Sequence, residues 1–455
     1  MIRNLKIFLC VLCLVFTLCL FSCSKDSDIP TDADEFVRAL DSKFESLGSY
    51  AADINIDMLL KVNGNNAKMT SEGRMITSGL KSEDDYYYFD ELITETKISS
   101  GNAVSATEVT AYVDGEMFFG SMESGEEAVM LRSKTSREDF LGIMNDADEE
   151  DVDMSVCAEK EFSRSQHGDY FATFSGYSKS KIYDIAKMFG IYDVIGSLDV
   201  ELYDVRLSIG ANKSLMADRV QVEFIFDDHE SANPSKIDLT MEIHSYNKAV
   251  REEINKENYK EVDDIAILFN IEKQLKEKVE NSGTFKLVNE QSGTNLRGDK
   301  ILDYKEQSAV SYGERNGSFF YDINCTITGT GNVKIQYENG YQWVTLEGGQ
   351  PASAIMTEAV ARAYIRSLIY SSFSLTAVTD VTIDSDGGCK VKIKESAIYD
   401  TCKSAIEGFG DSYKSASAFV KFFFTDSGEI TRVQTLLVVS GQRTTINSES
   451  VATFG

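Results

Sequence analysis

The chain has 455 residues, with 73 acidic and 45 basic side chains, so its formal net charge is −28 at pH 7. Such an excess of negative charge argues against nucleic-acid binding and against direct adsorption on anionic lipid head groups, since both favour a positive surface. The chain has only three prolines and is 11% aromatic, which is typical of a sheet-rich fold with packed cores rather than of a disordered stalk.

Residues 1–22 predict a lipoprotein signal peptide. Arg3 and Lys6 supply a positive start, and the apolar run that follows, residues 7–21, is shorter than the roughly 20 residues that span a bilayer. The sequence Leu20-Phe21-Ser22-Cys23 resembles the lipobox of bacterial lipoproteins. The resemblance implies cleavage before Cys23 and a diacylglycerol thioether on its sulfur. The alternative is an ordinary signal peptide or an uncleaved anchor with a chance cysteine.

The remaining chain predicts two domains, because it is too long for one typical core. Residues 23–33 are mostly polar and predict a lipidated flexible tether. We expect a first domain at 34–250, a linker at 251–262 and a second domain at 263–455.

In the first domain, the periodicity predicts a helix followed mainly by strands. Asp114-Gly115 predicts a two-residue hairpin turn with two positive φ angles. A capping-box spacing starts a helix at Ser136, and Ser178 starts another. In chain order we expect a helix at 34–47, strands at 50–62, 67–78 and 83–98, a hairpin at 106–119 that turns at Asp114-Gly115, a helix from 136, strands at 154–162 and 170–176, a helix from 178, and strands at 199–209, 215–227 and 236–248.

The second domain repeats this order, with Asn339-Gly340 in the place of the first hairpin turn. Ile182-Tyr183-Asp184 recurs as Ile398-Tyr399-Asp400, and Arg219-Val220-Gln221 recurs as Arg432-Val433-Gln434. In chain order we expect a helix at 263–279, strands at 284–290, 299–309, 317–327 and 330–337, a helix at 354–370, strands at 374–384 and 389–394, a helix at 396–408, and three final strands.

Because consecutive strands outnumber helices, the fold class is α+β with antiparallel sheet. We expect two tandem domains, each a curved antiparallel sheet, or open half-barrel, wrapped on short helices. This order, the lipobox and the hairpins Tyr112–Gly115 and Tyr337–Gly340 together resemble the LolA/LppX-like bacterial lipoproteins and the related tandem lipoproteins of Gram-positive bacteria. The resemblance implies a concave face that holds acyl chains, and it brings no catalytic signature.

No motif identifies a catalytic or metal centre, and we expect no cofactor. His167, His229 and His244 are far apart in the sequence and lack the spacing of metal ligands. Ser178 and Lys181 match S-x-x-K, but the companion triads of penicillin-binding enzymes are missing, so we interpret Ser178 as a helix cap.

Two acidic segments are interpreted as loops rather than calcium sites. Asp146–Asp153 lacks the turn glycine and the fixed register of an EF-hand, which favours a solvated loop. Asp384–Gly388 is placed as a hairpin turn.

Cysteines are too few for a disulfide framework. Cys389 and Cys402 either pair with each other or remain buried free thiols, and the sequence leaves both options open. Beyond Cys23 the cysteines are Cys157, Cys325, Cys389 and Cys402.

We therefore expect a non-enzymatic lipoprotein, anchored through Cys23 on the extracytoplasmic face of the cell membrane, that binds or carries an apolar, lipid-like ligand. The sequence does not identify the ligand-binding residues or a protein partner. It also does not show whether the membrane is an inner or an outer membrane. The alternative is a structural or interaction scaffold of the cell envelope, and an extracytoplasmic enzyme is a third hypothesis. An apolar pocket between sheet and helices favours the carrier, whereas an interior filled by its own side chains favours the scaffold.

Overall fold

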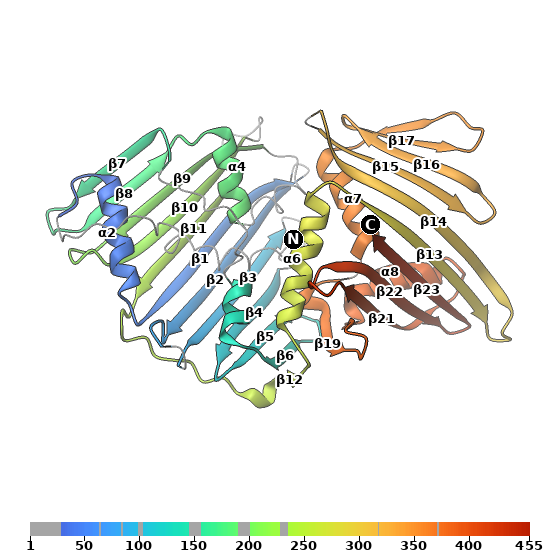
Figure 1. Cartoon of the computed structure of the whole chain (residues 1–455), viewed down its shortest axis with the longest axis horizontal. Coiled ribbons are helices and arrows are strands. Elements are labelled where there is room, and N and C mark those ends of the chain that lie inside the picture. Colours follow the sequence, from blue (N-terminus) through green and yellow to red (C-terminus); the bar gives the residue numbers. More distant parts are fainter. Residues whose placement is uncertain are drawn as a thin grey trace. The chain divides into compact units, whose positions relative to one another are not determined.

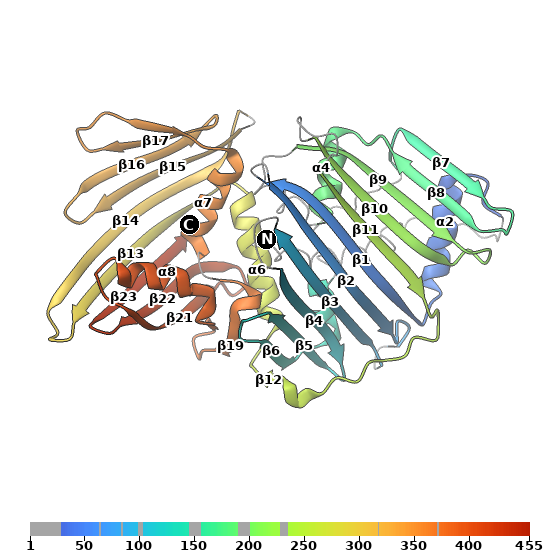
Figure 2. The same ribbon diagram turned by 180° about the vertical axis from the view of Figure 1, so that it is seen from behind.

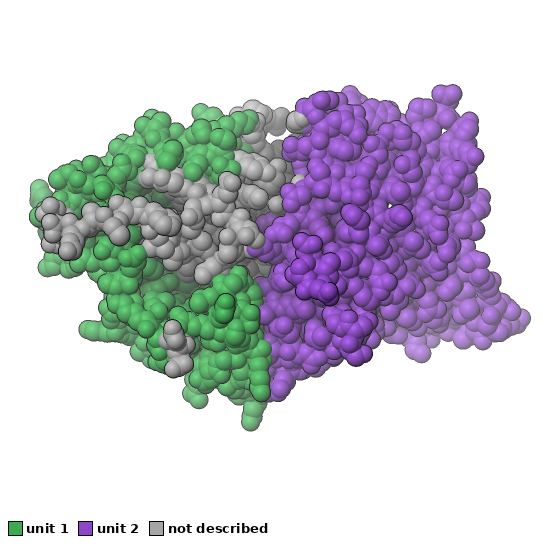
Figure 3. All heavy atoms as spheres, in the orientation of Figure 1, with its two compact units in different colours: residues 1–128, 134–259 green, residues 129–133, 260–455 purple. Residues whose placement is uncertain are grey.

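The computed structural model describes residues 29–62, 65–82, 85–98, 103–144, 156–189, 201–227, 235–316, 318–370 and 373–455. They form two sheets that are almost entirely antiparallel, with few helices, as the α+β class requires. The chain divides into two compact units, residues 1–128 with 134–259, and residues 129–133 with 260–455 (Figure 3). The division at 259/260 falls inside the predicted linker.

In the first unit, helices lie on one face of the sheet (Figures 1 and 2). The helices are α2 (Ala33–Glu45), α3 (Arg137–Met144) and α4 (Lys179–Met188). The strands are β1 (Ser49–Val62), β2 (Asn65–Ser78), β3 (Tyr87–Ile98), β4 (Val104–Val113), β5 (Glu116–Glu123), β7 (Glu159–Arg164), β8 (Tyr170–Ser175), β9 (Glu201–Ala211), β10 (Ala217–Asp227) and β11 (Lys236–His244). Their order is β5-β4-β3-β2-β1-β11-β10-β9-β8-β7.

In the second unit, the strand order is β18-β17-β16-β15-β14-β13-β23-β22-β21-β20-β19. The strands are β13 (Gly283–Asn295), β14 (Lys300–Arg315), β15 (Ser318–Ile327), β16 (Gly331–Glu338), β17 (Tyr341–Leu346), β18 (Ala352–Ile355), β19 (Val378–Ile383), β20 (Cys389–Ile393), β21 (Tyr413–Phe424), β22 (Ile430–Gly441) and β23 (Thr444–Phe454). The helices are α6 (Ala266–Glu280), α7 (Glu358–Tyr370) and α8 (Tyr399–Glu407), with short 3-10 turns at Leu375–Ala377 and Ser396–Ile398. Two short strands, β6 (Val129–Lys134) and β12 (Lys260–Glu261), pair in parallel, and a 3-10 turn at Lys256–Asn258 precedes β12.

The strand orders show that the two units share one topology. In each, the first strand pairs with the last, β1 with β11 and β13 with β23, so β13–β17 repeat β1–β5 and β19–β23 repeat β7–β11. Both hairpin predictions are confirmed, since φ is 54° at Asp114, 75° at Gly115, 53° at Asn339 and 82° at Gly340. The sequence patterns missed β6 and β18. The latter occupies residues assigned to the start of a helix, so α7 begins at Glu358.

We call the helix-bearing face of each sheet its inner face. In the first unit, the Phe140 ring of α3 stacks on Tyr112 with centroids 4.7 Å apart, and Phe189, after α4, packs edge-on against Phe224 at 5.6 Å. These aromatic side chains are buried. The core of the first unit therefore lies between its helices and the inner face of its sheet.

Residues 249–259, which we call the strap, pack on part of the outer face of the first sheet, over β1–β5. Ile254 and Tyr259 pack against an apolar cluster on β1–β5 that includes Phe89 and Phe118. The Tyr87 hydroxyl accepts a hydrogen bond from the Glu252 N–H at 2.9 Å and donates one to the Glu252 carbonyl at 3.1 Å. Most of the predicted linker is thus a packed element of the first unit rather than a free tether.

Candidate functional site

The structure does not bring the sequence-predicted polar residues together into a metal site. Cys23, His229 and Asp146–Asp153 lie outside the described residues. His167 lies between β7 and β8, and His244 Nε2 is 3.4 Å from an Asp53 carboxylate oxygen. In the described part of the chain, no three His, Cys, Asp or Glu side chains are placed to hold a metal ion.

The seryl hydroxyls singled out by the sequence cap helices. Ser178 Oγ accepts a hydrogen bond from the Lys181 N–H at 3.3 Å, at the start of α4. Ser136 Oγ accepts one from the Asp139 N–H at 3.0 Å, at the start of α3. The interpretation of the S-x-x-K match as a helix cap is therefore confirmed.

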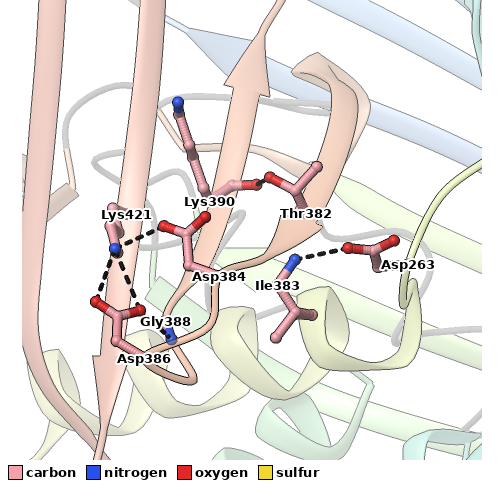
Figure 4. A network of polar contacts seen from close by, with 8 residues as sticks. All are labelled: Asp263, Thr382, Ile383, Asp384, Asp386, Gly388, Lys390 and Lys421. Carbon is pink, nitrogen blue, oxygen red and sulfur yellow. Dashed lines mark hydrogen bonds and ion pairs between the residues drawn. The ribbon is translucent and has the colours of Figure 1, made fainter.

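In the acidic turn between β19 and β20, two aspartates form ion pairs with one lysine (Figure 4). Lys421 Nζ lies 2.6 Å from a carboxylate oxygen of Asp384 and 3.1 Å from one of Asp386. A hydrogen bond from the Gly388 N–H, followed by the one from Lys421, lowers the pKa of Asp386. The same view shows Asp263, just before α6, accepting a hydrogen bond from the Ile383 N–H. This segment is the predicted hairpin turn, stabilised by ion pairs.

The described cysteines are all free thiols. Cys389 and Cys402 are buried in the second unit and do not form a disulfide. Burial raises the pKa of Cys389 to about 12, with nearby aspartates adding to the effect. A thiol with such a pKa stays protonated and is a poor nucleophile at neutral pH.

A polar hollow of about 430 Å³ lies at the β4–β5 hairpin of the first unit. Its walls carry charged and hydroxyl side chains and more polar than apolar surface, which suits a lipid chain poorly. It is lined by Asp114, Gly115, Glu116, Lys134, Thr135 and Ser136.

The inner face of the second sheet is buried where the helices cross it. Lys278 of α6 lies 4.6 Å over the ring of Phe454, and the Tyr364 ring of α7 is 5.7 Å from that of Tyr321. Ile406 of α8 is close to Gly441 on β22, so α8 lies on the same face. The described helices leave part of this face half-exposed.

That half-exposed part carries two cross-strand rows of mainly polar side chains on β14, β13, β23 and β22, which we call the polar rows. In the first row Glu306 faces Asn289, which faces Ser450, and in the second Tyr304 faces Gln291, which faces Ser448. Thr435 and Leu437 complete the two rows on β22. All eight residues are neither fully buried nor fully exposed. Polar side chains at inner positions of an antiparallel sheet are unusual, because that face normally packs on the core.

Glu306 is the chemical centre of the polar rows. Its carboxylate accepts hydrogen bonds from the Tyr304 hydroxyl at 2.8 Å, the Ser308 hydroxyl at 2.7 Å and the Asn289 amide at 3.3 Å. Burial raises the pKa of Glu306, but these hydrogen bonds outweigh it and hold the pKa below its ordinary value. Burial, followed by the bond to Glu306, raises the pKa of Tyr304 to about 12. At neutral pH the site is therefore an anion beside a protonated phenol.

The neighbourhood of Glu306 also contains a protonated thiol. Ser308 Oγ lies 3.0 Å from Cys325 Sγ, and burial raises the pKa of that thiol above its usual value. The cysteine therefore contributes a neutral, weakly polar wall to the site rather than a nucleophile.

In the first unit, polar side chains at inner positions lie on β2–β4 and are buried, among them Ser71, Asp90 and Glu108. Inner positions of β1, β11 and β10 are filled there by aliphatic side chains that are at most 3% exposed, such as Ile56, Leu239 and Val222. At matching inner positions of these three strands, the two units thus carry side chains of different polarity, although they share one topology. A sequence signal for this difference existed, because Glu306 is in phase with the buried Val310 and Tyr312 along β14.

Next to the polar rows, the inner positions of β15–β17 form an apolar strip of Ile327, Ile335, Val344 and Leu346. The first three are half-buried, and Leu346 is 54% exposed. Glu306 faces Ile327 across the β14–β15 pair, so the strip begins where the polar rows end. Together they present a surface with one polar and one apolar half on a single sheet face.

None of the described helices is long and apolar enough to cross a membrane. The membrane association expected from the lipobox thus concerns a segment outside the described residues.

No protein-family model matches the chain, and no curated protein matches it either. Among solved structures, the lipoprotein LppX of Mycobacterium tuberculosis is similar with 14% identity and a TM-score of 0.25, over 41% of this chain and 94% of LppX. The beta domain of the Bordetella autotransporter BrkA is similar with 7% identity and a TM-score of 0.12, over 90% of this chain and 98% of that domain. A DUF3598-family protein of unknown function from Nostoc punctiforme has 5% identity and a TM-score of 0.14, over 90% of this chain and 97% of its own. With TM-scores this low, none of these likenesses assigns a function to the chain.

Proposed function

We propose that the protein is a membrane-anchored, extracytoplasmic lipoprotein, and that its second unit binds an apolar, lipid-like ligand on the inner face of its sheet. The observation that carries the proposal is the half-exposed apolar strip, which the described helices leave uncovered beside the polar rows. The lipobox ending at Cys23 supports the membrane location. We also propose that each unit is an open half-barrel. No catalytic role and no protein partner are assigned.

Covering the strip provides the driving force for binding. Each Å² of apolar surface that a ligand removes from water stabilises the complex by about 25 cal/mol. A hydrocarbon chain lying across β15–β17 would cover Ile335, Val344 and Leu346 in one stretch, because their strands are neighbours in the sheet. A ligand with a long apolar part therefore suits this surface better than a small polar metabolite.

For the first unit, the packing favours a structural role. Its inner face is filled by its own side chains, including Phe140 against Tyr112 and Phe189 against Phe224. The strap packs on part of its outer face, over β1–β5. The first unit is accordingly proposed as a scaffold beside a ligand-binding second unit.

Native mass spectrometry combined with lipid extraction tests the proposal on residues 24–455, the expected body without its anchor. We expect an apolar molecule to copurify with this protein, and to be lost from Val344→Glu, which places a charge on the strip. Thr345→Glu is the matched control, because it introduces the same charge one residue away on the opposite face and beside Lys334. If nothing apolar copurifies and added lipids do not raise the thermal stability, the scaffold alternative is the better account of the whole protein.

A further inference from the structure

We propose that the polar rows bind the head group of the ligand, and that this head group is neutral and rich in hydroxyl groups, as a sugar or another polyol is. The inference rests on the proposed function, since it assigns the polar half of a ligand whose apolar half lies on the strip. Glu306, Asn289 and Gln291 are the residues expected to make the specific contacts.

The hydrogen-bonding groups of the polar rows match those of a polyol. Asn289 and Gln291 each offer amide donors and an acceptor, and the serine, threonine and tyrosine hydroxyls both donate and accept. Glu306 is an acceptor only, and its carboxylate already accepts hydrogen bonds from Tyr304, Ser308 and Asn289, with a further one from the Cys325 thiol. A hydroxyl group both donates and accepts, so several hydroxyls on one head group can satisfy this mixture of partners.

The charge of the site argues against an acidic head group. Glu306 is ionised, and none of the other polar-row residues is basic. A phosphate or carboxylate placed here would meet a like charge, and no residue of the polar rows supplies a counter-ion. The nearest lysine along β14, Lys305, points to the outer face, where it forms an ion pair with Glu290.

A cationic head group is also a poorer match than a polyol. The Glu306 carboxylate already accepts these hydrogen bonds, so its charge does not require a cation for stabilisation. The remaining polar side chains are neutral amides and hydroxyls, and a cation accepts no hydrogen bond, so their N–H and O–H donors would be left unused.

The first unit provides an internal comparison. Three of its matching strands, β1, β11 and β10, have aliphatic and fully packed inner positions, including Ile56 and Leu239. Packing alone therefore does not require polar side chains at these positions. The inner polar side chains of the first unit, such as Ser71 and Glu108, lie on β2–β4 and are buried. The polar rows differ from the inner polar side chains of the first unit because they are half-exposed rather than buried, and this exposure indicates a binding role.

The test uses amphiphiles with the same dodecyl chain and different head groups, each below its critical micelle concentration. Binding of dodecyl maltoside, dodecanoate and dodecyltrimethylammonium to residues 24–455 is measured by calorimetry, with free maltose as a further probe. We expect dodecyl maltoside to bind at least about tenfold more tightly than either charged amphiphile. This is the ratio expected for one charge-assisted hydrogen bond gained or lost.

Glu306→Gln should weaken dodecyl maltoside binding about tenfold and improve dodecanoate binding, because it removes the negative charge while keeping the shape. Glu290→Gln, on the outer face of the neighbouring strand, is the matched control and should change neither affinity. Gln291→Leu tests the same surface independently of the Glu306 hydrogen bonds, and it should weaken dodecyl maltoside binding without weakening dodecanoate binding.

Separate outcomes overturn the inference and the proposed function. If the three amphiphiles bind equally and Glu306→Gln changes nothing, the head-group inference is wrong while ligand binding by the second unit stands. Tightest binding of dodecanoate to the unmodified protein also overturns it. If no amphiphile binds, the proposed function fails. If free maltose binds as tightly as dodecyl maltoside, the polar rows recognise the head group and the role of the apolar strip is wrong.

Discussion

Replacing Tyr87 with phenylalanine should release the strap from the first sheet without disturbing the core beneath it. The Tyr87 hydroxyl forms two hydrogen bonds to the backbone of Glu252, at 2.9 and 3.1 Å. The ring is buried in the apolar cluster under the strap, and phenylalanine keeps it there. The substitution therefore removes only the hydroxyl contacts between two segments that are 165 residues apart in the chain.

The expected cost follows from those two contacts. A neutral hydrogen bond contributes about 1 kcal/mol net, and a backbone group left without a partner in a partly buried place costs about as much. We expect the strap to be destabilised by about 1–2 kcal/mol, which raises its open population about tenfold, since 1.4 kcal/mol is a factor of ten. Arg251 keeps its position 5.3 Å over the ring of residue 87, which limits the loss.

Hydrogen–deuterium exchange of the peptide covering residues 249–259 measures this effect directly. We expect exchange of these amides to be about tenfold faster in Tyr87→Phe, with unchanged exchange in β9–β11. Tyr203→Phe is the control, because Tyr203 is 70% exposed and should have no effect on the strap. Unchanged protection of residues 249–259 would refute the conclusion that the Tyr87 hydroxyl holds the strap on the sheet.

Three further predictions concern the anchor, the turns and the pH dependence. Cys23→Ser should abolish lipid attachment, since serine cannot form the thioether, and equal incorporation of radiolabelled lipid in mutant and wild type would contradict this. Gly340→Val and Gly115→Val should each lower the free energy of unfolding by about 1 kcal/mol or more, because valine tolerates positive φ poorly. An added Cβ at either glycine meets no atom closer than 4.0 Å, so unchanged urea midpoints would rule out backbone strain at both turns. Burial raises the pKa of Tyr304 and Tyr312 from 10.0 to about 12, so their stabilising contribution is complete below pH 10 and is lost as pH rises from 10 to 12. Equal urea midpoints at pH 9 and pH 12 would show that these tyrosines do not destabilise the fold on ionisation.

The repeated order of elements could be read from the sequence because local interactions determine it. Asp114-Gly115 and Asn339-Gly340 form the predicted turns because both central positions have positive φ, which these residues tolerate. Ser136 and Ser178 cap the predicted helices through backbone N–H groups only three residues away. Alternation and capping act between residues that are close together in the sequence, so both can be recognised without knowledge of the fold.

The strap could not be predicted from local patterns. Its apolar residues, among them Ile254 and Tyr259, are too widely spaced to indicate a helix or a strand, so the segment resembled a linker. Its position depends on Tyr87 and on the apolar cluster of β1–β5, which lie far away in the sequence. Only the folded sheet brings these partners together.

The candidate site shows most clearly which features the sequence predicts and which ones depend on the tertiary structure. The sequence by itself predicted a strand at 299–309, but it did not show that Glu306 faces inward among amides and hydroxyls. Sheet order decided this, because β14 lies beside β13, and β13 pairs with the last strand of the chain, β23. Asn289 and Ser450 thereby meet in one row although 161 positions separate them in the numbering. Periodicity and turn formation depend on a few neighbouring residues, so the sequence alone predicts them. A site assembled across neighbouring strands depends on hydrogen-bonded pairings between distant segments, which exist only once the sheet has formed.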